Sequence, residues 1–223
     1  MKKRLVIPIF FGVIGTAILL GLGLWQIQRL AWKEAILADI AAHIVAEPVP
    51  LPAQPDPEAD RYLPVRVAGR LTGEEVIVLA SVKQIGAVHR LMSVLETDGR
   101  RVLVDRGYVP IESNPAPQTG PLEVLGNLHW PQEVDSFTPE PDLATGLWFA
   151  RDVPAMAKAL QTEPILIVAR QVTAYSPPVT PLPVTTQGIP NDHLNYAITW
   201  FLLALVWAGM TVFLVWRIRQ RND

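Results

Sequence analysis

The segment from Pro190 to Trp216, PNDHLNYAITWFLLALVWAGMTVFLVW, decides the fold class of this chain. Its apolar part begins at Ala197 and is about 20 residues long, the length that an α-helix needs to cross the hydrocarbon core of a bilayer. A histidine, His193, stands at the start of the segment among polar neighbours. We therefore predict a transmembrane helix at 193–216 with a ligand-type side chain at its entrance, where ionisable residues tend to serve function.

A second apolar run, from Leu5 to Trp25, follows three basic residues at positions 2–4. A cleaved signal peptide would have an apolar core of about 7–15 residues followed by small residues. This run is longer and ends in LWQI, so we predict an uncleaved transmembrane helix at 5–25. Apolar residues spaced by four from Ile36 to Ile44 predict that the helix continues beyond the membrane to about Ala46.

The basic residues that flank the two apolar runs predict the orientation of the chain. Three of them precede the first run, and Arg217, Arg219 and Arg221 follow the second. Because Lys and Arg concentrate on the cytoplasmic side, we expect both termini in the cytoplasm and the middle of the chain outside it. The predicted organisation is a cytoplasmic N-terminus at 1–4, a transmembrane helix at 5–25, a periplasmic domain at 26–192 with Pro-rich linkers at 47–57 and 176–190, a transmembrane helix at 193–216 and a cytoplasmic C-terminus at 217–223.

Composition excludes several classes of function. The chain has no cysteine, so disulfides, thiol catalysis and thiolate metal sites are excluded. Its net charge is −2 and it lacks a basic patch interleaved with aromatic residues, so nucleic acid is not an expected partner. Half of the residues are hydrophobic and only 18% are charged, which fits a protein whose partner is the lipid bilayer.

The segment between the two apolar runs is predicted to be mostly β-structure. Asp98-Gly99 between two apolar runs predicts a hairpin, and Asp152 is the expected N-cap of a short helix at 152–160. The strands are expected at 65–69, 75–82, 90–97, 101–109, 121–130 and 164–172. The predicted fold class is a membrane protein with two transmembrane α-helices flanking one mostly-β (α+β) extracytoplasmic domain.

Few residues of this middle segment have the pattern of a catalytic site. The chain has no nucleophile elbow and no Gly-rich phosphate loop. The histidines His43, His89 and His129 have no partner histidine at helical spacing, so we expect them to be surface or packed residues. Arg106 in DRGYV is either a functional arginine or, as we favour, a residue that ends a strand where Gly107 allows a bend.

The second transmembrane helix has a more informative pattern. Positions 193, 196/197, 200, 204 and 207 share one helical face. His193 followed by Ala197 and Trp200 leaves a gap with an aromatic floor, into which a flat macrocycle could enter with the imidazole as axial ligand of a haem iron. Arg29, or less readily Lys33, on the first helix could pair with haem propionates. The alternative is an interfacial belt of aromatic and basic residues in which His193 is only hydrated.

The chain resembles the surfeit locus protein 1 family, known in yeast as Shy-type proteins, over almost its whole length. The matching segments are GLGLWQIQRLAWKEAIL (21–37), RYLPVRVAGRL (61–71), RRVLVDRGYVP (100–110), GLWFARDVPAMAKAL (146–160) and NDHLNYAITWFLLAL (191–205). It is similar to bacterial members, because an anchor stands where a mitochondrial presequence would. The family often has Asn-Arg-Gly-Trp at positions 105–108, where this chain has Asp-Arg-Gly-Tyr.

The resemblance implies an assembly factor for cytochrome c oxidase in the bacterial inner membrane. It implies binding of haem a and its delivery to oxidase subunit I, with haem a synthase as a further candidate partner. The family's proposed haem ligand corresponds to His193, and the tryptophan of the same motif to Trp200. Three alternatives stay open, namely a scaffold that holds an oxidase intermediate without binding haem, an enzyme that acts on haem, and a membrane-tethered ligand sensor.

Overall fold

The computed structural model describes residues 2–113, 115–173, 179–187 and 189–221. The chain divides into two units. One, which we call the helix pair, contains the residues up to Asp39 and those from Thr186 onward, and the other, the outer domain, runs from Ile40 to Thr185. The predicted linker at 176–190 falls partly on positions 176–178 and 188, which lie outside the described residues.

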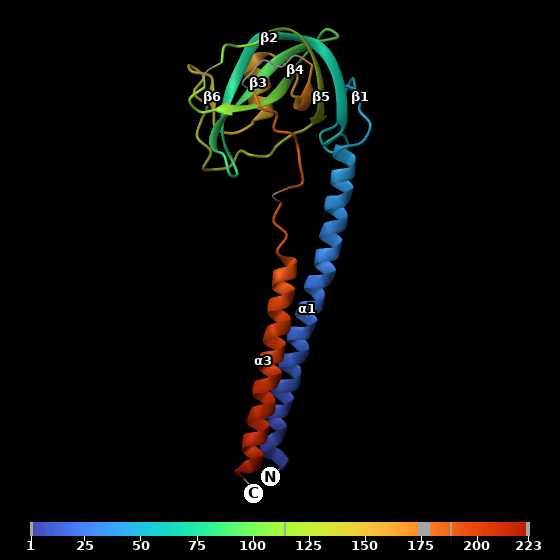
Figure 1. Ribbon diagram of the computed structural model, residues 1–223, viewed down its shortest axis with the longest axis vertical. Helices are drawn as coiled ribbons and strands as arrows, with labels where there is room; N and C mark the ends of the chain where they lie inside the picture. The colour runs from blue at the N-terminus through green and yellow to red at the C-terminus, as the bar shows by residue number, and fades with distance from the viewer. Residues whose placement is uncertain (1, 114, 174–178, 188, 222–223) are drawn as a thin grey trace. The chain divides into compact units, whose positions relative to one another are not determined.

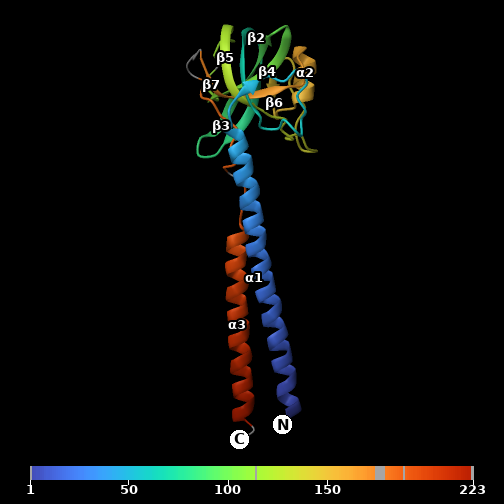
Figure 2. The ribbon, with the colours of Figure 1, turned by 90° about the vertical axis from the view of Figure 1, so that its right-hand side faces the viewer.

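The helix pair consists of α1 (Lys2–Ile44) and α3 (His193–Gln220), which run side by side in Figure 1 and Figure 2. Both are long and apolar enough to cross a membrane. α1 continues without interruption past the predicted end of the first span at position 25 and stops close to the predicted Ala46. α3 begins at the predicted His193 and extends four residues beyond 216. Two apolar helices at the ends of a mixed sheet domain confirm the predicted fold class.

The outer domain is a small closed β-barrel. Strands β2 (Pro64–Val82), β3 (Gly86–Thr97), β4 (Arg100–Pro110), β7 (Leu166–Val172) and β5 (Thr119–Leu128) pair in that order, and β5 pairs back onto β2. The two short strands β1 (Val49–Pro50) and β6 (Leu147–Trp148) pair in parallel with β2. In Figure 2 the short helix α2 (Val153–Leu160) lies on the right of the outer domain and β5 on the left.

The length of β2 allows the barrel to close. We expected two strands at 65–69 and 75–82, but they form one strand with an irregularity between Leu71 and Glu75. Gly73 lies there with a φ of 90°, a conformation that glycine adopts without strain. The first half of β2 pairs with β5 and the second half with β3, so the bent strand belongs to both sides of the barrel.

Alternation along the strands produces two cores. One set of alternate residues from all five long strands fills the barrel interior: Val65, Val67, Leu71, Leu95, Val102, Val104, Leu122, Val124, Leu128, Ile165, Ile167 and Ala169. Residues on the opposite face of β3, β4 and β7, such as Leu103 and Val168, pack under α2, with Met156 fully buried. Because both faces are covered, β4 has a run of six buried residues in place of simple alternation.

Local signals for the hairpin and the short helix are confirmed. Asp98 and Gly99 have φ angles of 46° and 74° and connect β3 to β4 as the two-residue turn that their sequence predicts. Asp152 accepts a hydrogen bond of 3.0 Å from the backbone N–H of Ala155, as an N-cap does. Such a cap stabilises a short helix by about 1 kcal/mol.

One expectation about the end of a strand was wrong. The strand does not end at Arg106-Gly107 but continues to Pro110, with a bulge opposite Leu91. Gly107 has a φ of 119°, and a side chain there would come within 2.0 Å of the Thr180 carbonyl oxygen. The described parts of the predicted linkers also join the barrel, because Thr180 exchanges two backbone hydrogen bonds of 2.8 Å with Tyr108 and the 47–57 segment supplies β1.

Arg106 is held inside the outer domain, which supports the structural interpretation of DRGYV. It donates hydrogen bonds to Glu75 Oε2 at 2.8 Å, Ser93 Oγ at 2.8 Å and Gln118 Oε1 at 2.7 Å. Its neighbour Asp105 is fully buried and accepts a hydrogen bond from Arg90. Buried charges of this kind stabilise a fold only when their partners are present.

A cluster of charged residues surrounds His129. Arg151 lies 3.5 Å from Asp105 and also binds Glu133. The His129 ring stacks on Tyr62 with 5.4 Å between centroids, and its Nδ1 is buried without a hydrogen-bond partner. Burial, aided by the positive charges of Arg151, Arg61 and Arg90 and opposed by Glu133, lowers the pKa of His129 to about 4. His129 is therefore a packed neutral histidine, as its isolation in the sequence predicted.

This environment predicts a loss of stability in mild acid. The unfolded chain takes up a proton at His129 near pH 6.5, whereas the folded chain resists protonation until about pH 4. The free energy of unfolding should therefore fall with decreasing pH across that window. The variant His129→Phe keeps the stack on Tyr62, and its fall should be smaller by on the order of 2 kcal/mol. Urea unfolding of the detergent-solubilised chain at pH 7 and pH 4.5, followed by near-ultraviolet circular dichroism, measures the difference. Equal losses in wild type and variant would contradict the assignment.

Candidate functional site

The helices α1 and α3 pack closely because small residues line the contact. Ala197 and Ala204 of α3 are at most 2% exposed, although the rest of the helix is largely exposed. On α1, a Cβ atom added to Gly12 would come within 2.1 Å of Thr211, and one added to Gly23 within 2.5 Å of the Phe201 ring. Glycine and alanine allow two apolar helices to approach closely enough for van der Waals contact to hold them together in a membrane.

This close approach brings His193 against Gln26. His193 is the first residue of α3, and its Nδ1 lies 2.8 Å from Oε1 of Gln26, whose residue is only 8% exposed. Because an amide oxygen only accepts hydrogen bonds, Nδ1 carries the hydrogen and the lone pair is on Nε2. A hydrogen bond to the second ring nitrogen fixes the tautomer and orientation of a metal-binding histidine, so His193 is prepared to offer Nε2 to a ligand.

A second contact holds the chain segment that leads into His193. Lys33 of α1 donates a hydrogen bond from Nζ to the backbone carbonyl of Pro190. Asn191 lies between Pro190 and α3, and its Oδ1 is buried without a hydrogen-bond partner. The entrance of α3 is thus fixed to α1 at two levels, at Lys33 and at Gln26.

The predicted site residues on α3 do not all lie as expected. Trp200 is partly buried, while Tyr196 and Trp207 of the predicted face are 56% and 44% exposed. Ala197 has no exposed surface, so the open gap that we expected beside it is absent. The small side chain of Ala197 serves the close packing of the helix pair, and clearance for a flat ligand has to come from another side of His193.

The two predicted cations on α1 make different contacts. Arg29 is exposed, and its guanidinium lies over the ring of Trp32 at 3.9 Å, a cation–π contact along the same helix. Lys33, the less favoured of the two in the sequence, is the one that reaches the entrance of α3. Lys33 therefore contacts the backbone of the segment that leads into His193.

Gln26 is the site residue that sequence reasoning missed. It lies three residues after Gly23, so both are on the face of α1 that packs against α3. Gln28, two residues further, is exposed. A polar residue on the small-residue face of an apolar helix was the available signal, because such side chains find their partners on the neighbouring helix.

The site can supply one ligand atom, Nε2 of His193, to a metal. Among residues 2–113, 115–173, 179–187 and 189–221, no group of three or more His, Asp or Glu side chains lies close enough to hold a metal ion. His193 by itself supplies one neutral imidazole nitrogen, which is what an axial position of haem iron takes. The helix entrance thus offers one nitrogen ligand, from His193.

Comparison with known proteins finds a family and several relatives that match most of the chain. The model of a family described as "SURF1 family" matches residues 13–205. "Surfeit locus protein 1" of Rattus norvegicus is 30% identical over 81% of this chain and 67% of its own length, and the Homo sapiens protein of the same name is 30% identical over 82% and 69%. A "SURF1-like protein" of Monosiga brevicollis is 30% identical over 87% and 82%.

The packing of the helix pair predicts a cysteine cross-link. The chain has no cysteine of its own, so Gly12→Cys combined with Thr211→Cys introduces the only two thiols. Because these positions touch, mild oxidation should form a disulfide in membranes and protect both thiols from a maleimide reagent. As a matched control, Gly21→Cys with Leu202→Cys places the thiols at open and exposed positions and should stay labelled. Cross-linking of the control pair alone would contradict the packing.

Proposed function

The chain belongs to the SURF1 family, and on this basis, together with the geometry of His193, we propose that it carries haem a to a haem-copper oxidase. Family membership implies a role in the assembly of cytochrome c oxidase. The finer role proposed here is that the helix pair binds haem a and that the chain delivers it to oxidase subunit I. No bond-making step is assigned to the protein, so it acts as a chaperone of haem and not as an enzyme.

The hydrogen bond between Gln26 and His193 is the observation that carries this proposal. It commits Nδ1 and leaves Nε2 as the ring nitrogen able to bind iron. Hydrogen-bond donation from Nδ1 also fixes the orientation of the imidazole ring toward a metal. A single neutral nitrogen ligand is compatible with release, because handover to another protein requires that only one coordinate bond be exchanged.

The remaining residues of the site have supporting roles in the proposal. Trp200, two turns from His193, would pack against the macrocycle. Lys33 and Arg29 would pair with the propionates, with Lys33 giving up the Pro190 carbonyl when it does so. Ala197 is fully buried and keeps the helices close enough for Gln26 to reach His193.

The proposed location is the bacterial inner membrane, with both termini in the cytoplasm and the outer domain in the periplasm. The arginines at the C-terminal end of α3 and the basic residues at positions 2–4 support this orientation. Subunit I of the oxidase would then meet the haem at the outer face of the membrane, and haem a synthase is a candidate source of the ligand.

A second candidate function is favoured by a different observation. The loop between β5 and β6 exposes apolar side chains: Phe137 is 90% exposed, Leu143 70% and Val134 55%. Exposed apolar residues in one loop are typical of a surface that contacts another protein. The outer domain could therefore hold an oxidase intermediate as a scaffold, without any haem bound to the helix pair.

A visible spectrum separates the two candidates. The chain made alongside haem a synthesis and purified should show a Soret band, whereas a scaffold would be purified with oxidase subunits and without one. His193→Ala should lose the band, while His43→Ala, which removes an exposed histidine in the last turn of α1, should keep it. An absent band in the wild type would refute the carrier function, and an unchanged band in His193→Ala would remove His193 from the site.

The orienting role of Gln26 has its own test. Gln26→Leu should weaken haem binding by about 10–100-fold, because the second ring nitrogen loses its acceptor. Gln26→Glu keeps an acceptor and should retain binding, and Gln28→Leu, on an exposed position of the same turn, should have no effect. Haem titration of the purified variants in detergent gives the affinities. Equal effects of Gln26→Leu and Gln28→Leu would show that hydrogen bonding to His193 does not matter.

The proposed orientation is tested with reporters. A reporter that is active only in the cytoplasm should work when fused after Arg221 and fail when inserted near Gln54 in the outer domain. A reporter that is active only in the periplasm, placed at the same two positions, should give the opposite result. Cytoplasmic activity at Gln54 would overturn the orientation.

A further inference from the structure

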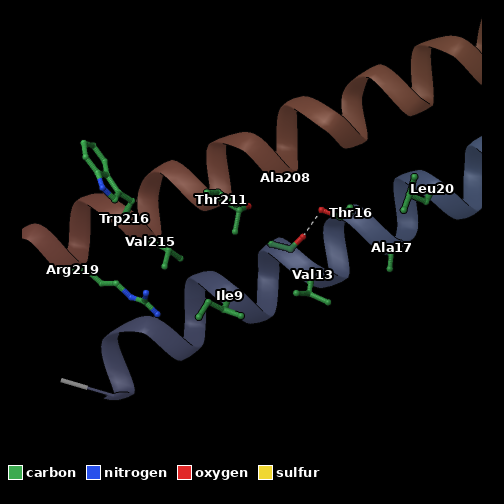
Figure 3. A pocket seen from close by; sticks show the side chains of 12 residues that line it. Ile9, Val13, Thr16, Ala17, Leu20, Ala208, Thr211, Val215, Trp216 and Arg219 are labelled. Carbon is green, nitrogen blue, oxygen red and sulfur yellow. Dashed lines mark hydrogen bonds between the residues drawn. The ribbon is translucent and has the colours of Figure 1, made fainter.

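A groove runs between α1 and α3 at the end of the helix pair that contains the two chain termini. Its volume is about 740 Å³. It exists because three lining positions have small residues, Gly12 and Ala17 on α1 and Ala208 on α3. Figure 3 shows side chains of both helices along it.

The walls of this groove are apolar even where threonines line it. Thr16 donates its hydroxyl hydrogen to the Gly12 carbonyl at 2.8 Å, and Thr211 donates to the Trp207 carbonyl at 2.8 Å. Both hydroxyls therefore donate within their own helices, and a ligand in the groove does not have to accept a hydrogen bond from them. The surface that remains suits a hydrocarbon chain.

One end of the groove is charged. Arg219 lines it, and in Figure 3 its side chain extends from α3 toward the first turns of α1 near Ile9. Among the described residues, no carboxylate forms an ion pair with Arg219. Trp216 lines the same end, and tryptophan with arginine at the end of a membrane helix is typical of the headgroup level. A guanidinium at this level can bind a phosphate group through two parallel hydrogen bonds.

The length of the groove suits the chains of a lipid. From Ile9 to Leu20 the α1 wall rises by about 17 Å, close to the roughly 15 Å depth of one leaflet of the hydrocarbon core of a bilayer. The acyl chains of one phospholipid can therefore lie along the apolar walls.

We propose that this groove binds one anionic phospholipid, with its acyl chains along the apolar walls and its phosphate on Arg219. The proposal requires that the helix pair lies in a membrane, and it is independent of haem binding at His193. Arg219 and the small lining residues are its two determinants, the first for the headgroup and the second for the chains.

Native mass spectrometry of the full chain, purified in detergent and mixed with dioleoylphosphatidylglycerol or zwitterionic dioleoylphosphatidylcholine, tests the proposal. The wild type should retain one phosphatidylglycerol at collision energies that strip phosphatidylcholine. Arg219→Ala should lower that retention at least about ten-fold, as expected for a lost charged hydrogen bond. Arg217→Ala removes the same charge from an exposed position that does not line the groove, and should have little effect.

Ala17→Phe fills the groove from its exposed side and should lower retention of both lipids while the helix pair still forms. The Gly12–Thr211 cysteine cross-link, made in the same background, reports on the pairing. Equal retention of the two lipids, equal effects of Arg219→Ala and Arg217→Ala, or unchanged retention in Ala17→Phe would each overturn the proposal. The proposal would also be overturned if a membrane polypeptide bound to residues 9–20 in a one-to-one complex and displaced the lipid, because the groove would then hold a helical partner.

Discussion

The packing of small residues between α1 and α3 is the constraint on which the candidate site depends. Two apolar helices in lipid gain nothing from hiding apolar surface, so only close van der Waals contact and hydrogen bonds can hold them together. Gly12, Gly23, Ala197 and Ala204 permit that contact. A larger residue at any of them would move Gln26 away from His193, and the imidazole would lose the acceptor that fixes its tautomer.

Local sequence signals predicted the elements of this fold well. Two apolar runs, alternating strands, the Asp98-Gly99 turn and the Asp152 cap depend on neighbours in the chain, and the structure contains each of them. Closure of the barrel was not predicted, because it results from pairing β2 with both β3 and β5 across distant parts of the sequence. Alternation along β2 identifies buried positions but does not specify the partner strand.

The candidate site was predicted only in part for the same physical reason. His193 stands out as an ionisable residue at a membrane boundary, and a helical wheel places Ala197 on its face. Which helix covers that face, and how closely, is decided by α1, so the expected gap at Ala197 is instead a packing contact. Arg29 and Lys33 are four residues apart on α1 but have different contacts. Arg29 lies over the ring of Trp32, whereas Lys33 donates a hydrogen bond to the Pro190 carbonyl.

The bond between Gln26 and His193 joins two helices that belong to opposite ends of the chain, and this has a thermodynamic consequence. If a ligand binds more tightly when the bond is intact, then by linkage the bound ligand also holds the helices together by the same free energy. A partner that draws α1 and α3 apart would weaken the ligand in proportion. Loading and unloading would then be two directions of one equilibrium, set by the separation of the helices, and release would need no chemical change in the ligand.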